Sequence, residues 1–141
     1  MTRPTHLTST FQSKASQGMH RLMHDIRRER PSQAEHRLRE ACRQCGLQIL
    51  GYEVEAYDEE ANEGRSGAQW YDVAIQAYGA TVYLDAAENW STKRLEKRIR
   101  EKVNYCKRRG IPYFRIKQGS SVEMRARIES SLIQLAARRA I

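Results

Sequence analysis

The amino-acid sequence predicts an α/β fold whose elements follow the order helix, three strands, helix, strand, helix. Apolar residues recur at helical spacing in three segments and alternate with polar residues in strand-like segments between them. Capping pairs and glycines mark where these segments begin and end. The chain has 141 residues, of which 40% are hydrophobic. That is enough for one domain with a real core and not for two.

The first helix of the domain is predicted to begin after Ser32. Glu35 lies three positions further on, which is the pattern of a capping box, and Gly46 ends the helix. A strand is expected over residues 47–56, and Gly51 within it indicates a β-bulge.

The second and third strands are predicted to form a hairpin. Residues 70–78 alternate between two faces, and one face is expected to carry four side chains: Tyr71, Val73, Ile75 and Ala77. Gly79 and Ala80 are expected to form a tight turn, which is followed by a strand over residues 81–85.

The second long helix is expected to begin at Ser91 or Thr92 and to end at Gly110. A short and largely buried strand is predicted over residues 111–116. Ser120 then repeats the capping-box pattern and begins the last helix.

Residues 1–30 are interpreted as a basic N-terminal arm that precedes the domain of residues 31–141. The first 17 residues are polar and show no periodicity, which is typical of a loose arm. Residues 18–30 carry apolar side chains at helical spacing, so a short basic helix is predicted there. These side chains are Met19, Leu22, Met23 and Ile26.

Charge is unevenly distributed along the chain. The net charge of +8 and the isoelectric point near 9.7 favour an anionic partner, with nucleic acid as the leading candidate. Acidic residues concentrate in residues 53–63 and basic residues in residues 93–117. A generally basic, solvated surface is the alternative, but this segregation favours a basic face directed at a partner.

Two of the three cysteines, Cys42 and Cys45, form a C-x-x-C pair, and the third is Cys106. A zinc or redox site is one interpretation of the pair. Buried free thiols are favoured, because the pair falls on the apolar stripe of a predicted helix and no second Cys/His pair lies at ligand spacing. The odd number of cysteines argues against a disulfide framework.

The chain contains no apolar run that approaches the roughly 18 residues of a membrane span, and no apolar signal segment follows Met1. Charged residues make up 30% of the chain, as in a protein with a heavily charged surface. We therefore expect a soluble, cytoplasmic protein with no membrane partner.

Two acidic residues occupy positions that an ordinary soluble fold avoids. Asp72 lies in the middle of an apolar strand, and Asp85 ends the neighbouring strand of the same hairpin. Carboxylates on adjacent strands repel each other unless a cation lies between them, and Mg²⁺ or Mn²⁺ prefers such oxygen ligands. The pair therefore predicts a metal site suited to attack of water on a phosphodiester.

Structural interpretations of these acids stay open. Asp85 is also explained as a cap at a strand end, and Asp72 as the partner of a core arginine such as Arg115. The capping box accounts for Glu35 without any catalytic role. Glu88 follows Asp85 within one turn and is also explained as an exposed loop residue.

Several segments in this order resemble the PD-(D/E)xK nuclease superfamily, and within it the small single-domain group around very-short-patch-repair endonucleases. The opening helix of that group is similar to RPSQAEHRLREACRQCG, which contains Glu35. The strand with the first metal-binding aspartate resembles WYDVAI, with Asp72, and the next strand resembles TVYLDAAENW, with Asp85. The helix, glycine and strand that follow are similar to LEKRIREKVNYCKRRGIPYFRI.

The resemblance implies a three-layer, restriction-endonuclease-like core that acts as a divalent-metal-dependent DNA endonuclease, with Mg²⁺ or Mn²⁺ as its cofactor. Asp72 and Asp85 are then expected to hold the metal, with Glu35 or Glu88 as a third ligand or as a base that orients water. Ala87 occupies the position of the family's motif lysine, so the resemblance implies that the following helix supplies a lysine.

Three lysines of that helix are candidates for this role, Lys93, Lys97 and Lys102, and Lys97 is expected to be the catalytic one. Four basic residues of the helix are expected to bind nucleic-acid phosphates: Lys93, Arg94, Arg98 and Lys102.

Two other functions stay open. A catalytically inactive nucleic-acid-binding module would keep the fold and use only the basic residues, and the missing motif lysine favours it. A protein-interaction domain would use the acidic segment of residues 53–63. The retained pair of Asp72 and Asp85 favours the nuclease, because a binding protein gains nothing from acids that face phosphate.

Overall fold

The structure, a computed structural model, describes residues 19, 21–57 and 68–139. Its elements are α2 (Gln33–Gln44), β1 (Gln48–Tyr57), β2 (Ala68–Ala77), β3 (Ala80–Ala87), α3 (Lys93–Arg109), β4 (Tyr113–Lys117) and α4 (Ser121–Arg139). A helix over residues 21–29, called the N-terminal helix below, precedes them. The predicted order of elements and the short basic helix are confirmed. Most of the expected arm, and the acidic segment from residue 58 onward, lie outside the described residues.

Side-chain caps fix where two of the helices begin. Oγ of Ser32 accepts a hydrogen bond from the main-chain N–H of Glu35, at 3.2 Å, and so caps α2. Oγ1 of Thr92 accepts one from the N–H of Leu95, at 3.1 Å, so Thr92 and not Ser91 caps α3. The four helices of the described chain include none that is long and apolar enough to cross a membrane.

The strands form one mixed sheet in the order β1-β2-β3-β4. β1, β2 and β3 are antiparallel neighbours, whereas β4 lies parallel to β3. Parallel neighbours need a long crossover connection, and α3 provides it here. The predicted bulge at Gly51 is confirmed, because the register of β1 on β2 shifts between Ile49 and Gly51.

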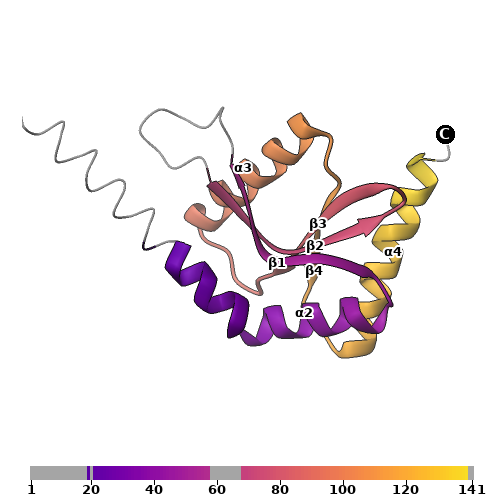
Figure 1. Cartoon of the computed structure of the whole chain (residues 1–141), viewed down its shortest axis with the longest axis horizontal. Helices are drawn as coiled ribbons and strands as arrows, with labels where there is room; N and C mark the ends of the chain where they lie inside the picture. The colour runs from indigo at the N-terminus through magenta and orange to yellow at the C-terminus, as the bar shows by residue number, and fades with distance from the viewer. Residues whose placement is uncertain (1–18, 20, 58–67, 140–141) are drawn as a thin grey trace, which may run out of the picture.

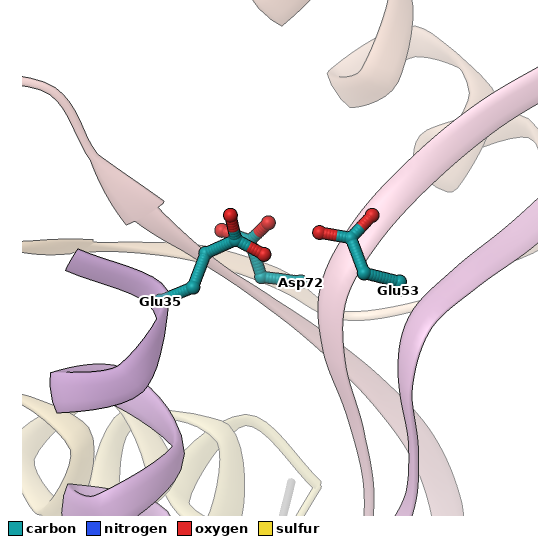
Figure 2. A group of neighbouring side chains, drawn as sticks. All are labelled: Glu35, Glu53 and Asp72. Carbon is teal, nitrogen blue, oxygen red and sulfur yellow. The ribbon is translucent and has the colours of Figure 1, made fainter. Parts of the chain in front are cut away.

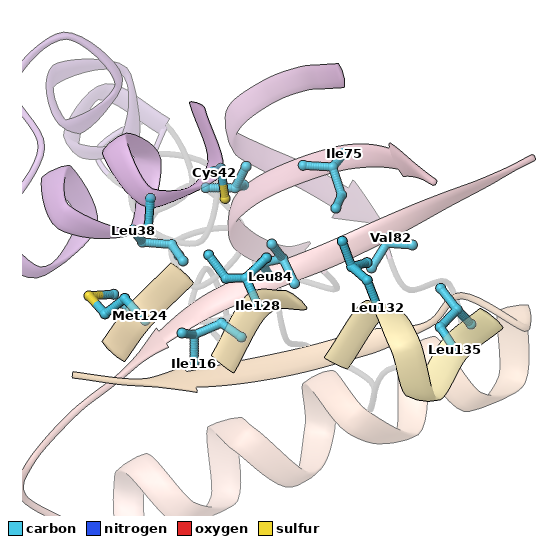
Figure 3. Packing of buried hydrophobic residues seen from close by; sticks show 13 residues of the cluster. Leu38, Cys42, Ile75, Val82, Leu84, Ile116, Met124, Ile128, Leu132 and Leu135 are labelled. Atoms are coloured by element: carbon cyan, nitrogen blue, oxygen red, sulfur yellow. The ribbon is translucent and has the colours of Figure 1, made fainter. Parts of the chain in front are cut away.

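Helices cover both faces of the sheet, which gives three layers (Figure 1). α2 and α4 bury the larger core cluster on one face (Figure 3), in which the labelled residues are Leu38, Cys42, Ile75, Val82, Leu84, Ile116, Met124, Ile128, Leu132 and Leu135. α3 covers the other face, where Tyr105 and Cys106 pack with Tyr71, Ala74 and Tyr83. The expected α/β class is confirmed as a mixed sheet between helices.

The hairpin of β2 and β3 turns one residue earlier than expected. Ala77 pairs with Ala80, so the turn consists of Tyr78 and Gly79. Both residues have positive φ, 51° for Tyr78 and 75° for Gly79, as a type I′ turn requires. The prediction was wrong because tyrosine favours strands and rarely adopts a left-handed backbone.

The alternation of side chains along β2 breaks at Asp72. Val73 lies in the cluster beneath α2 and α4, but Tyr71 lies in the cluster beneath α3 and stacks on Tyr83, with 4.2 Å between ring centroids. The expectation that Tyr71 and Val73 share a face was therefore wrong. The cause lies in β1, where Glu53, opposite Asp72, has a φ of 49° and interrupts the regular pleat.

The cysteines are free thiols. Cys42 and Cys106 are buried and Cys45 is half-buried, so the expected burial is confirmed for the first two. Burial raises the pKa of Cys42 to about 12, which disfavours the thiolate that a metal would need.

The strained turn allows a test of the hairpin. Tyr78→Asn is expected to raise the free energy of unfolding by up to about 1 kcal/mol, because a left-handed backbone costs most L-residues roughly 1–2 kcal/mol and asparagine tolerates it better. Chemical denaturation measures the difference. Gly79→Ala is the control, and it is expected to lower the free energy of unfolding. The added methyl group meets no atom within 4 Å, so any loss of stability comes from the backbone conformation alone. A destabilised Tyr78→Asn variant would mean that the tyrosine side chain contributes packing.

Candidate functional site

Three carboxylates from three elements converge beside the sheet (Figure 2). Glu35 comes from the first turn of α2, Glu53 from the middle of β1 and Asp72 from β2. One oxygen of each lies within 4.8 Å of one oxygen of each of the others. Glu35 is 7% exposed and Glu53 only 2%, while Asp72 is half-buried. Such a concentration of negative charge away from water is costly unless a cation or a proton offsets it.

Glu35 has one oxygen engaged and one available. Oε1 accepts a hydrogen bond from the hydroxyl of Ser32 at 3.0 Å, which is a variation on the predicted capping box. Oε2 is buried and makes no hydrogen bond within the described residues, although the guanidinium of Arg39 lies 3.9 Å away. A buried oxygen without a hydrogen-bond partner is unusual in a protein, and a bound water, proton or cation would satisfy it.

Glu53 is the member of the cluster that sequence analysis missed. Its Oε2 lies 2.5 Å from Nδ1 of His24 on the N-terminal helix. Burial above all, and then the charge of Arg27, lower the pKa of His24 to about 4. This low pKa favours the neutral imidazole, whose Nδ1–H tautomer is the form that can donate to Glu53.

Asp72 and Asp85 exchange hydrogen bonds with each other's strands. The main-chain N–H of Asp72 donates to Oδ1 of Asp85 at 2.8 Å, and the N–H of Ala86 donates to Oδ2 of Asp72, also at 2.8 Å. Backbone pairing of β2 with β3 reaches only to Val73 and Leu84. The two carboxylates therefore replace main-chain carbonyls as acceptors where the strands stop pairing.

Asp85 lies beside the acidic cluster but is held by other partners. Its Oδ2 accepts hydrogen bonds from Nζ of Lys102 at 2.7 Å and from the hydroxyl of Tyr113 at 2.5 Å. Burial raises the pKa of Tyr113 beyond its usual range, so the phenol keeps the proton that it donates. With donors on both oxygens, Asp85 acts as the anchor of Lys102.

Two acids of the cluster, Glu35 and Asp72, have raised pKa values. Burial, and then the neighbouring Glu53 carboxyl, raise the pKa of Glu35 to about 7. Burial, and then the charge of Asp85, hold the pKa of Asp72 well above its usual range, and Lys102 partly opposes this. The acids thus bind protons or metal more readily than isolated carboxylates do.

Other residues predicted for the site lie elsewhere. Glu88 pairs with Arg115 at 2.8 Å near the surface, so Arg115 is not the partner of Asp72. The first four basic residues of α3 are exposed: Lys93, Arg94, Lys97 and Arg98. Lys102, one turn further on and half-buried, is the lysine that reaches an acid of the predicted motif.

The donor set of the cluster fits a hard divalent cation. Every donor is a carboxylate oxygen, which Mg²⁺ and Mn²⁺ prefer over nitrogen or sulfur. Oε2 of Glu35 makes no hydrogen bond within the described residues and so keeps its lone pairs for such an ion. Glu35, Glu53 and Asp72 are therefore the residues that could hold such an ion.

Comparison with protein-family models, with curated proteins and with solved structures finds no match for this chain. The chemistry of the site therefore follows from its own residues. Clustered acids with a lysine beside them can combine cation binding with stabilisation of a developing negative charge.

The raised pKa of Glu35 makes stability depend on pH. Because the pKa is about 7 in the folded chain and 4.5 for a free glutamate, the folded state holds more protons between these values. Stability is then expected to fall as pH rises through this window, by on the order of 3 kcal/mol at most. In chelator-treated protein, denaturant unfolding at pH 5 and pH 8 measures this loss, and Glu35→Gln should reduce it. An equal loss in both proteins would contradict the assignment to Glu35.

Proposed function

We propose that this protein is a divalent-metal-dependent endonuclease that hydrolyses phosphodiester bonds in DNA. The observation that carries the proposal is the convergence of Glu35, Glu53 and Asp72, with their oxygens within 4.8 Å, beside Lys102 on Asp85. Acids that hold Mg²⁺ or Mn²⁺ next to a lysine form the arrangement that metal-assisted phosphodiester hydrolysis needs.

The topology supports a restriction-endonuclease-like core. The chain runs helix, three strands, helix, strand, and the last strand joins the sheet parallel to the third. Asp72 on β2 and Asp85 on β3 face each other where these strands stop pairing. This is the order of elements and acids that the sequence resemblance implies, and here Glu53 joins Asp72 where the family motif would use the second aspartate.

Glu35, Glu53 and Asp72 would hold the cation, and Asp85 would act through Lys102. When bound, such an ion polarises a phosphate oxygen and lowers the pKa of a water molecule. Asp85 has donors on both of its oxygens and therefore keeps its orientation without a metal. Sequence analysis expected Asp85 to be a metal ligand. In this proposal Asp85 positions Lys102 instead.

Lys102 would stabilise the negative charge that develops on the phosphate. Its ammonium group is fixed at 2.7 Å from Asp85, and its charge lowers the pKa of Asp72, so it lies close to the acidic cluster. A lysine in this place compensates for Ala87 at the motif position. Lys97, in contrast, is exposed on α3 and contributes to the basic surface.

DNA is the substrate class that the charge favours. α3 presents Lys93, Arg94, Lys97 and Arg98 to solvent, on the helix that also carries Lys102. Cations in this position can contact phosphates on either side of the bond to be cut. A binding module without chemistry remains the second candidate because Ala87 replaces the motif lysine, but the placement of Lys102 favours the nuclease.

The first test is cleavage of labelled duplex and branched DNA with Mg²⁺ or Mn²⁺. Asp72→Asn is expected to abolish metal-dependent cutting, because it removes a charged ligand while keeping an oxygen that can accept the hydrogen bond from Ala86. Glu88→Gln is the matched control, since this acid pairs with Arg115 near the surface, and should cut like the wild type. Salt-sensitive DNA binding without cutting by the wild type would leave only the binding module.

A second test separates the two lysines. Lys102→Met is expected to lower kcat by about 100- to 1,000-fold, the effect of losing one group that stabilises transition-state charge. Lys97→Met should leave kcat unchanged and reduce the salt dependence of DNA binding by about one phosphate contact. Single-turnover cleavage and binding at several salt concentrations measure these effects, with thermal unfolding as the control for folding. The opposite pattern would assign catalysis to Lys97.

A further inference from the structure

The N-terminal helix is held to the domain by its polar side. Its apolar side chains are exposed by 51–61%: Met19, Leu22, Met23 and Ile26. A helix that adds stability by burial would turn such a stripe inward. The contacts that hold this helix are polar instead, and most of them are made to the residues that surround Glu53.

The first of these contacts reaches the carboxylate of Glu53. His24 donates from Nδ1 to Oε2 of Glu53 at 2.5 Å. The imidazole stacks on Trp70, with 3.9 Å between ring centroids and 8° between the planes. Trp70 precedes Asp72 by two residues on β2, so the ring that fixes His24 belongs to the strand that carries another acid of the cluster.

The second contact reaches the main chain of Glu53. Nε of Arg28 donates to the carbonyl oxygen of Tyr52 at 3.2 Å, and Nη2 donates to that of Glu53 at 3.0 Å. Glu53 has a φ of 49°, a conformation that glutamate rarely adopts and that surrounding contacts must hold in place. Arg28 supplies such contacts on both peptide groups next to this residue.

The helix is itself anchored from α2. The guanidinium of Arg39, 4% exposed, donates to the carbonyl oxygens of Arg28 at 2.9 Å and Arg27 at 3.1 Å. Arg39 follows Glu35 by one helical turn. The same helix α2 therefore carries one acid of the cluster and fixes the helix that holds a second acid.

We propose that the N-terminal helix is part of the metal centre, and that His24 is the positioning residue that orients the Glu53 carboxylate towards the cation. This inference rests on the proposed metal site. His24 contacts one oxygen of Glu53, and this carboxylate has an oxygen within 4.8 Å of oxygens of Glu35 and Asp72. Hydrogen bonds of this kind to ligating carboxylates typically change metal affinity by about 10- to 100-fold.

Two substitutions separate the hydrogen bond from the stacking. His24→Phe keeps an aromatic ring for Trp70 but has no donor, and is expected to weaken Mn²⁺ binding by about 10- to 100-fold. His24→Asn lacks the stack but places an amide N–H near the position of Nδ1, and should bind Mn²⁺ within a few-fold of the wild type. Isothermal titration of chelator-treated, full-length protein with Mn²⁺ measures both affinities.

The control is Arg21→Ala on the same helix. Arg21 contacts Glu55, two residues beyond Glu53, and does not reach the cluster, so Mn²⁺ affinity should be unchanged. Thermal unfolding without metal separates loss of fold from loss of affinity. If His24→Phe does not fold, His24→Leu removes the donor with a smaller side chain and carries the same test.

Each outcome decides between explanations. Weak binding by His24→Phe with near-normal binding by His24→Asn supports the positioning role. Binding of Mn²⁺ by a folded His24→Phe as tight as that of the wild type overturns it and leaves the nuclease proposal intact. If the wild type itself does not bind Mn²⁺, the metal site fails and the positioning role fails with it.

Discussion

The hydrogen bonds that Asp72 and Asp85 exchange determine the layout of the site. Each carboxylate accepts a main-chain N–H from the other strand, at 2.8 Å, just where the backbone pairing of β2 and β3 stops. Beyond the point where it stops pairing with β2, β3 still pairs with β4, and Asp85 lies opposite Arg115. Neither acid is a defect in the sheet, because each supplies an acceptor that a main-chain carbonyl would otherwise provide.

This exchange also separates the charges into two groups. Asp72 joins Glu35 and Glu53 in an acidic cluster, while Asp85 turns to Lys102 and Tyr113 on the side of α3. Asp85 is nearly fully buried and is paired with the ammonium group of Lys102. Within the described part of the chain, the three acids of the cluster have no lysine at such a short distance. Burial above all, and then the charge of neighbouring carboxylates, raise the pKa values of Glu35 and Asp72, and a divalent cation would offset this charge.

Periodicity and caps predicted the elements because each is a local property of the sequence, as Thr92 and Gly110 at the ends of α3 illustrate. The site was predicted only in part. Simple alternation places Glu53 and Glu55 on the same face, yet Glu53 is buried and Glu55 exposed. The left-handed backbone of Glu53 changes the pleat between them, and tertiary contacts such as those of Arg28 hold this conformation. Local sequence patterns do not contain that information.

The charge of the acidic cluster also links the N-terminal helix to the proposed catalytic site. A phosphodiester is anionic, so its approach to the acidic cluster is unfavourable until the cluster is neutralised. In the proposed nuclease, the position of Glu53 would therefore affect substrate binding as well as cation binding, and contacts with His24 and Arg28 hold this position. The N-terminal helix contacts the domain through polar side chains and leaves its apolar residues Leu22 and Ile26 exposed. In the proposed site, placement of one carboxylate takes precedence over burial of these apolar residues.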